Sequence, residues 1–182
     1  MAYRVNGVTI GFQGINLNCG RYCLEALMLW RHGSKFGKVS QNAIYSVPNL
    51  RFEAQYAANA RAAHSAAVQA HINERFKIAF DPADHMADYG LKDVPKPAGG
   101  PAWEAMLRAY GPIIVGGNIG AVRILCGYGA HFVLVVGVNA GGEVEYYDPL
   151  RLDYKLGFGP TGTAIASFEG LADTPVYIAR AG

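Results

Sequence analysis

Apolar side chains near the start of the chain recur at the three- and four-residue spacing of a helix. The apolar positions in this stretch are Cys23, Leu24, Leu27, Met28 and Trp30. Asn18 stands where an N-cap is expected, and Gly33 stands where a helix commonly ends. The pattern therefore predicts a helix from Cys19 to about Arg31.

Three further segments before residue 101 have patterns of their own. Residues 1–11 predict an edge strand, made of 3–5 and 8–10 around an Asn-Gly turn signal. Residues 49–80 are rich in alanine and contain neither proline nor glycine, which predicts two helices. Three prolines and a pair of glycines between 84 and 101 predict a loop, which we expect at the rim of a substrate cleft.

Strand patterns dominate the rest of the chain, after one short helix. Pro101 suits the first turn of that helix, whose apolar face is formed by Trp103, Met106, Leu107 and Tyr110. The strand candidates are 113–115, 122–126, 132–138, 144–147, 164–168 and 176–179. Gly141-Gly142 predicts a hairpin between the third and the fourth of them. A mainly helical half, 1–100, followed by a mainly β half, 101–182, predicts a single α+β domain in which the helix from Cys19 packs on an antiparallel sheet.

Composition narrows the class of protein. With 182 residues, 51% of them hydrophobic, the chain can bury the core of one domain. The net charge is only +2 and lysines and arginines form no block, so neither nucleic acid nor an anionic membrane is an expected partner. Three cysteines suggest no disulfide framework, which favours a reducing compartment. Neither a secretory signal nor an apolar run of about 18 residues is present, so we expect a cytoplasmic protein, or an effector exported by a non-Sec route.

Four residues have the chemistry and the order of a thiol hydrolase. Cys19 lies at a helix start, where unpaired backbone N–H groups and the helix dipole favour a thiolate. Gln13 lies six residues earlier on a Gly-containing loop, so its amide and the backbone N–H of Cys19 could both donate to an oxyanion. His131 opens an apolar strand and could act as the base, while Asp148 closes the next strand and could orient it.

Each of these residues also has a purely structural interpretation. A cysteine on a helix is usually a small buried hydrophobe, which is our interpretation of Cys23, and Cys126 is similar. His131 could be a core histidine, and Asp148, before a proline, could simply form a turn. A simple ladder puts His131 opposite 150–152, so contact with Asp148 needs a diagonal reach or a bulge. The other four histidines have no metal-ligand spacing and the glycines have no nucleotide-binding spacing, so we expect no metal and no cofactor.

These motifs resemble those of the papain-like cysteine peptidases. The Gln-to-Cys spacing, the Asn-Cys-Gly context, the strands that follow Gly111 and His131, and the Tyr-Asp-Pro end are most similar to one bacterial branch. That branch contains the bacteriocin-processing C39-like peptidases and the AvrRpt2-like effector proteases. The similarity covers 11–31 and roughly 103–150, whereas the middle of the chain, 32–100, resembles neither group.

The resemblance implies a papain-like fold and a peptidase that acts on a protein or peptide substrate. Cys19 would then be the nucleophile, His131 the general base and acid, and Asp148 the residue that orients the imidazole. Gln13 would donate to the oxyanion. A related possibility is a deamidase or acyltransferase with the same site, because an acyl-enzyme can be resolved by water or by an amine. A further possibility is a binding module that keeps the fold without the activity.

Overall fold

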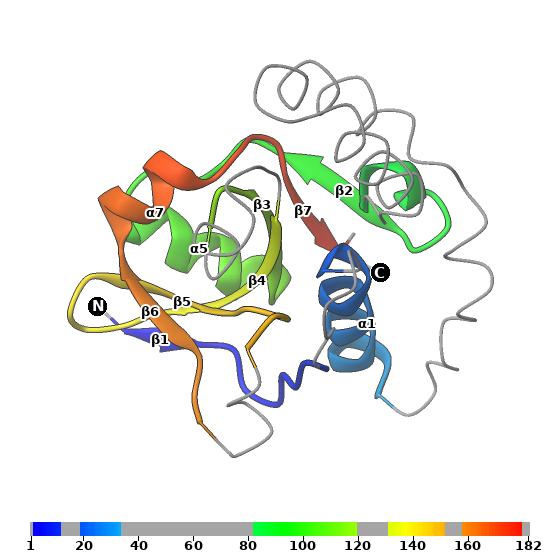
Figure 1. Ribbon diagram of the computed structural model, residues 1–182, viewed down its shortest axis with the longest axis horizontal. Helices are drawn as coiled ribbons and strands as arrows, with labels where there is room; N and C mark the ends of the chain where they lie inside the picture. Colours follow the sequence, from blue (N-terminus) through cyan, green and yellow to red (C-terminus); the bar gives the residue numbers. More distant parts are fainter. Residues whose placement is uncertain (1, 12–18, 34–81, 120–130, 152–157, 180–182) are drawn as a thin grey trace, which may run out of the picture.

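The computed structural model describes residues 2–11, 19–33, 82–119, 131–151 and 158–179 (Figure 1). Its helices are α1 (Cys19–His32), α5 (Gly100–Tyr110) and α7 (Ile165–Leu171), with one 3-10 turn, η2 (Pro82–His85). Its strands are β1 (Tyr3–Arg4), β2 (Leu91–Val94), β3 (Ile113–Gly117), β4 (His131–Val138), β5 (Glu143–Tyr147), β6 (Thr161–Ala164) and β7 (Val176–Ala179). Helices packed with an antiparallel sheet confirm the predicted α+β class. The predicted helices in 49–80 and the predicted strand at 122–126 lie outside the described residues.

The described strands form one antiparallel sheet in the order β2-β7-β3-β4-β5-β6. β1 also pairs with β4, with Arg4 opposite Gly137. This pair lies beyond the last pair of β3 with β4, which is Ile113 opposite Val135. Because β5 pairs with one edge of β4, β3 and β1 pair one after the other along its opposite edge. An ion pair between Arg4 and Glu145 of β5 ties β1 to the sheet. β4 is thus the central strand on which the fold is assembled.

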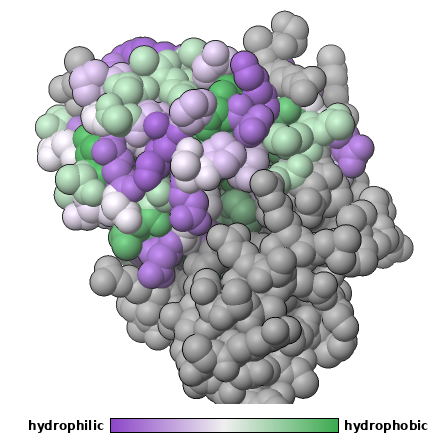
Figure 2. Space-filling model, turned by 90° about the horizontal axis from the view of Figure 1, so that it is seen from above, coloured by the Kyte–Doolittle hydropathy of each residue, from purple (hydrophilic) through white to green (hydrophobic). Residues whose placement is uncertain are grey.

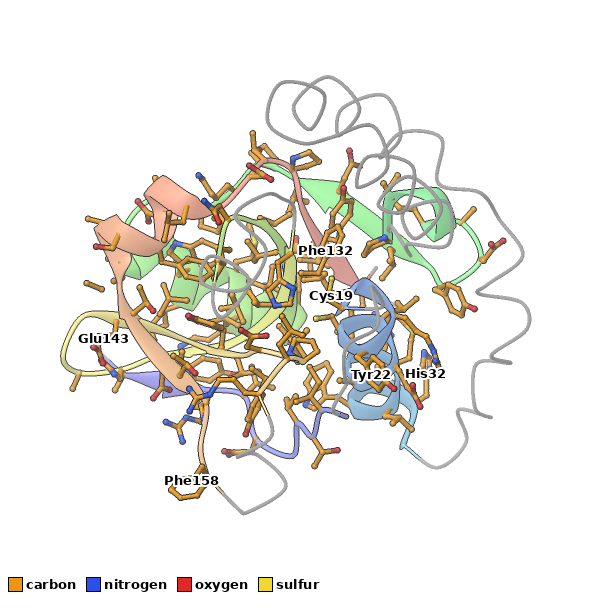
Figure 3. All side chains as sticks on the ribbon, viewed as in Figure 1. Cys19, Tyr22, His32, Phe132, Glu143 and Phe158 are labelled. Atoms are coloured by element: carbon orange, nitrogen blue, oxygen red, sulfur yellow. The ribbon has the colours of Figure 1, made fainter. Side chains whose placement is uncertain are left out.

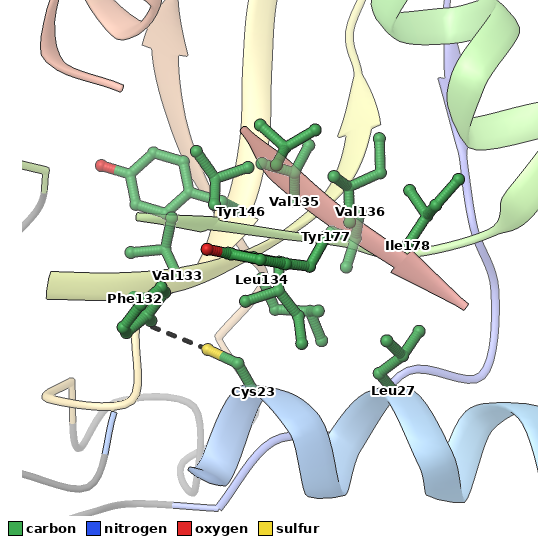
Figure 4. Close-up of a cluster of buried hydrophobic side chains, with 14 of the residues drawn as sticks. Cys23, Leu27, Phe132, Val133, Leu134, Val135, Val136, Tyr146, Tyr177 and Ile178 are labelled. Atoms are coloured by element: carbon green, nitrogen blue, oxygen red, sulfur yellow. Dashed lines mark hydrogen bonds between the residues drawn. The ribbon is translucent and has the colours of Figure 1, made fainter. Parts of the chain in front are cut away.

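Helices cover both faces of β4. On one face lies α1, from which Cys23 and Leu27 point toward the strand (Figure 4). On the other face, Tyr146 of β5 packs against Phe168 of α7, with ring centroids 5.3 Å apart, and Phe168 meets Trp103 of α5 edge-on at 5.6 Å. All eight residues of β4 are therefore buried, which explains why the strand is an almost continuous apolar run rather than an alternating one.

α1 begins at Cys19 and ends at His32, so the prediction from its apolar spacing is confirmed. Gly33 follows with φ of +59°, a left-handed conformation that glycine adopts without strain. Arg31 and His32 lie in the last turn, where positive charge complements the negative end of the helix dipole. The helix therefore has a defined C-terminal end. Asn18, the predicted N-cap, lies outside the described residues.

Two predictions about the first hundred residues were wrong. Residues 8–10 form no strand, because the chain leaves the sheet after Tyr3–Arg4 and turns toward α1. The region 84–101 is more than a loop, because it contains β2, which pairs along its whole length with β7. The strand is only four residues long, Leu-Lys-Asp-Val, and although Leu91 is fully buried its sequence has no alternating pattern that would predict a strand.

The strand predicted at 164–168 was wrong as well. The chain leaves β6 and enters α7 at Ile165. Phe168 lies about one helical turn after Ile165 and has no exposed surface. The apolar spacing was therefore that of a short helix. On α5, Trp103 is fully buried as predicted, but Tyr110 is 37% exposed because it is the last residue of the helix.

The surface of the described part is mixed in polarity. On the face shown in Figure 2, hydrophilic side chains surround small groups of hydrophobic ones. The large hydrophobic side chains that are exposed among the described residues are Leu29, Tyr110 and Phe158. Such residues occur singly on most proteins. None of the described helices is long and apolar enough to cross a membrane.

Candidate active site

Cys19 is the first residue of α1 and lies at the positive end of the helix dipole. The residue is 8% exposed, and its sulfur accepts a hydrogen bond from the backbone N–H of Phe132 at 3.4 Å. Figure 3 shows Cys19 beside Phe132, where the start of α1 approaches β4. The thiol that the sequence places at a helix start is therefore held against the strand that begins at His131.

His131 and Asp148 form a buried pair behind the thiol. The ring nitrogen Nε2 of His131 lies 2.7 Å from Oδ1 of Asp148, a hydrogen-bond distance. His131 is 1% exposed and Asp148 is fully buried. A buried carboxylate needs a partner, and the imidazole is the partner that the sheet supplies.

The register of the β4-β5 hairpin explains how His131 and Asp148 come into contact although a simple ladder does not place them opposite each other. The last pair of β4 with β5 is Leu134 opposite Tyr147, so one further step would place Asp148 opposite Val133. Val133 and His131 are two residues apart and therefore share a face of β4, which makes Asp148 a diagonal neighbour of His131. The ladder also shifts by one residue between Val135 and Gly137, as in a β-bulge. The sequence predicted either a diagonal contact or a bulge, and the hairpin has both.

Asp148 also forms the turn that its position before a proline suggested. The same atom, Oδ1, accepts a hydrogen bond from the backbone N–H of Leu150 at 2.9 Å. The carbonyl of Asp148 accepts from the N–H of Arg151 at 3.0 Å. These two bonds fix the carboxylate before it meets the imidazole, so the turn and the contact with His131 are parts of one arrangement.

The Cys19 thiol is easier to deprotonate than an ordinary thiol. Burial by itself raises its pKa, but the positive charge of His131 and a hydrogen bond with its ring lower that pKa, and the net shift is downward. The backbone N–H groups of Phe132 and Gly20 lower the pKa of the thiol further. Each of these groups stabilises negative charge on the sulfur, so the site favours the thiolate.

The imidazole shifts in the complementary direction. Burial lowers the pKa of His131, whereas the charge on Cys19, the hydrogen bond to Asp148 and the hydrogen bond with Cys19 raise it, to about 9. Since Nε2 faces Asp148, Nδ1 is the ring nitrogen left for the sulfur. A lowered thiol pKa beside a raised imidazole pKa favours a thiolate and an imidazolium side by side at neutral pH. Such a pair is an activated nucleophile with its acid already in place.

Cys23, one helical turn after Cys19, has the opposite character. It has no exposed surface, and its thiol donates a hydrogen bond to the carbonyl of Phe132 at 3.5 Å. Burial, together with the negative charges of Cys19 and Asp148, raises the pKa of Cys23 well above its ordinary value. Cys23 is therefore a protonated core thiol, in keeping with its predicted interpretation.

The structure brings together three of the four residues that the sequence singled out. Gln13, the predicted oxyanion donor, lies outside the described residues. Sequence reasoning missed one group, the backbone N–H of Phe132, because every residue except proline carries such a donor and no side chain marks the one that is used. Its position next to His131 is the only available signal.

Two other features of the described part bear on the site. No group of three or more His, Cys, Asp and Glu side chains in this part could hold a metal ion. A surface cavity of about 400 Å³ lies near the other end of α1, between Trp30 and Tyr110. Neither Cys19 nor His131 lines this cavity, so it is separate from the chemistry described above.

A helix-start thiol beside an imidazole at the first residue of a central strand resembles the arrangement of a papain-like thiol hydrolase. A family model described as papain-like cysteine protease AvrRpt2 matches residues 52–158. Because this match spans more than half of the chain, the chain belongs to that family and the protein is a cysteine protease. Its substrates are therefore proteins or peptides.

The family match also corrects the extent of the resemblance. It includes 52–100, part of the middle region that we expected to be unlike the family, so that expectation was wrong there. It contains His131 and Asp148 but begins after Cys19 and Gln13, whose resemblance rests on their own local motif. Among curated proteins, none matches the chain.

Proposed function

We propose that the protein hydrolyses peptide bonds with Cys19 as nucleophile, His131 as acid and base, and Asp148 as the residue that orients the imidazole. The observation that supports this best is the chain of contacts from the Cys19 sulfur through the His131 ring to the Asp148 carboxylate. The three groups come from α1, β4 and the end of β5, and each has a second contact that limits its movement.

In the first half of the proposed reaction, the Cys19 thiolate attacks the carbonyl carbon of the scissile peptide. The electron pair of the C=O bond moves to the oxygen, which becomes an oxyanion. When this intermediate collapses, the C–N bond breaks and the imidazolium of His131 gives its proton to the departing amine. The products of this step are a free amine, a thioester on Cys19 and a neutral imidazole.

In the second half, neutral His131 removes a proton from a water molecule, which attacks the thioester carbon. The C–S bond then breaks, so the carboxylic acid leaves and the thiolate returns beside the imidazolium. Asp148 accepts the Nε2–H throughout, which keeps Nδ1 directed at the sulfur and stabilises the positive ring. We assign oxyanion stabilisation to the backbone N–H of Cys19 and the side-chain amide of Gln13.

We also propose that the protease is a bacterial effector, on the strength of its resemblance to the AvrRpt2-like effector proteases. Its substrate would then lie in a recipient cell. A fusion of the chain to a reporter that is active only in recipient cytosol tests this proposal. Signal in recipient cells that depends on the export machinery of the producer supports it, and signal confined to the producer refutes it.

The test of the catalytic proposal compares peptide cleavage by wild type, Cys19→Ala, His131→Ala and His32→Ala. A peptide library is incubated with each protein, and new N-termini are counted by mass spectrometry. We expect no cleavage with Cys19→Ala and a loss of about 10²–10⁴-fold with His131→Ala, the usual contribution of a general acid and base. His32 is exposed at the far end of α1, so His32→Ala is the matched control and should cleave like wild type.

A second readout is the pH dependence of Cys19 alkylation by iodoacetamide, followed by intact mass and peptide mapping. We expect rapid alkylation well below the ordinary thiol pKa of about 8.5, and loss of that advantage in His131→Ala. Cleavage by Cys19→Ala, or a wild-type thiol that titrates normally, contradicts the assignment. A library in which glutamine is converted to glutamate without chain cleavage would instead identify a deamidase with the same nucleophile.

A further inference from the structure

We propose that Cys23 is a positioning residue for catalysis, because its thiol holds the carbonyl of Phe132, the residue whose backbone N–H donates to Cys19. This inference rests on the proposed role of Cys19 as nucleophile. It assigns a function in the site to a cysteine that would otherwise count only as core.

The two cysteines of α1 bind the two polar backbone groups of a single residue. The N–H of Phe132 donates to the sulfur of Cys19 at 3.4 Å. The thiol of Cys23 donates to the carbonyl of Phe132 at 3.5 Å (Figure 4). Cys19 and Cys23 are four residues apart, so they lie on the same side of the helix one turn apart. The start of α1 is thereby joined to β4 at the residue that follows His131.

The sheet explains why the backbone N–H and carbonyl of Phe132 are open to this use. β5 ends its pairing with β4 at Leu134, two residues before Phe132 is reached, whereas β3 still pairs there through Gly116. The ring of Phe132 is held closely as well, because a Cβ placed on Gly116 would lie only 3.0 Å from it, and Tyr177 packs at a centroid distance of 6.4 Å. Sheet and helix together leave the backbone on both sides of the Phe132 Cα little room to rotate.

The contact can persist while Cys19 is negatively charged. Only a protonated thiol can donate to a carbonyl, and burial and the nearby charges raise the pKa of Cys23 well above its ordinary value. The negative charge on Cys19 is one cause of that increase in pKa. Ionisation of the nucleophile therefore strengthens the hold of Cys23 on its proton, so that the donor remains present in the active form.

A core residue and a positioning residue predict different results when the thiol is replaced. Cys23→Ala removes the donor and leaves a small void, Cys23→Val fills the space without a donor, and Cys23→Ser keeps a donor. If Cys23 only fills space, Val should be the best substitute and reactivity of Cys19 should be unaffected once the protein folds. If Cys23 positions Phe132, Ser should be the best substitute for the reactivity of Cys19.

The experiment measures the rate of Cys19 alkylation by iodoacetamide against pH in full-length wild type and the three variants, with thermal unfolding of each. At about pH 6, we expect Cys23→Ala and Cys23→Val to react about fivefold more slowly than wild type, the effect of one hydrogen bond, with a higher titration midpoint. Cys23→Ser should restore most of the rate. Should Cys23→Ala fail to fold, the comparison of Val with Ser carries the test.

The outcomes separate this inference from the proposed function. Wild type that reacts at low pH together with Val or Ala variants of unchanged profile overturns the inference and leaves the catalytic role of Cys19 intact. A Ser variant that is as slow as Val also overturns it, because the donor would then not be what matters. A wild-type thiol that titrates normally overturns the proposed function and this inference with it.

Discussion

Replacement of Asp148 separates the charge of the carboxylate from its shape. In Asp148→Asn, an amide oxygen can still accept from the Leu150 N–H and from Nε2 of His131, which now lie 2.9 and 2.7 Å from Oδ1. The orientation of the ring is thus kept and the negative charge is lost. In Asp148→Ala both of these hydrogen bonds disappear, although His131 stays buried.

The magnitudes follow from these contacts. Changing a charge-assisted hydrogen bond into a neutral one costs about 1 kcal/mol, which corresponds to roughly a fivefold smaller equilibrium constant for forming the thiolate-imidazolium pair in Asp148→Asn. Removing one partner of a buried ion pair costs about 3–5 kcal/mol, so Asp148→Ala should lose that much unfolding free energy. This is a large share of the stability of about 5–15 kcal/mol of a typical domain.

Two measurements check the reasoning. Titration of the His131 ring by NMR should give a lower pKa in Asp148→Asn than the value of about 9 in the wild type, and Cys19 alkylation at low pH should slow in parallel. Denaturant unfolding should place Asp148→Asn close to wild type and Asp148→Ala far below it. Asp173→Asn, at an exposed carboxylate, is the control and should change neither. Identical His131 titrations in wild type and Asp148→Asn would refute the argument.

Three further predictions test the pairing and packing that hold the site. Folding raises the pKa of His131 and lowers that of Cys19, so between about pH 6.5 and 8.5 the folded thiolate-imidazolium pair and the two neutral groups of the unfolded chain each hold one proton, and the unfolding free energy should be nearly independent of pH there. The cleavage rate should persist to about pH 9 and fall above it as the imidazolium loses its proton, and a rate that already falls near pH 6.5 would contradict the raised pKa of His131. Gly137→Ala would put a Cβ 2.6 Å from the Glu145 carboxylate and 2.9 Å from the Tyr3 carbonyl, so chemical denaturation should show a loss of about 1–3 kcal/mol, whereas an unchanged midpoint would mean that β1 does not pack there. Trp103→Ala, at a fully buried ring, should lose about 3–5 kcal/mol in the same assay, and a loss below about 1 kcal/mol would contradict its place in the core.

Much of the architecture around the site followed from simple patterns. The three- and four-residue spacing predicted α1, and the paired glycines predicted the hairpin of β4 and β5. These features are local, because a cap, a turn residue or an apolar period is visible within a few residues. Cys19, His131 and Asp148 were identifiable for the same reason, since each lies at an end of such an element.

The remaining features depend on contacts that no local pattern encodes. β2 has only four residues and no alternating pattern, so its pairing with β7 is what identifies it as a strand. The register shift between Val135 and Gly137 leaves Val136 without a partner in β5, and its carbonyl instead accepts from Val5 beside β1, 2.8 Å away. A bulge whose partner comes from the far end of the chain cannot be read from the strand itself. The use of the Phe132 N–H by Cys19 is hidden in the same way, because it is a backbone group.

Asp148 shows how local and long-range features combine at this site. As a residue before proline it ends β5 in a turn, and the Leu150 N–H holds its carboxylate through that turn. As the next residue along the β5 register, it lies diagonally across from His131 and on the same face of β4. The turn interpretation and the catalytic interpretation are therefore not competitors, because the turn supplies the rigidity that an orienting carboxylate needs. A turn-forming aspartate that follows a strand paired with a histidine-bearing strand should accordingly be tested for a role in the site before it is dismissed as structural.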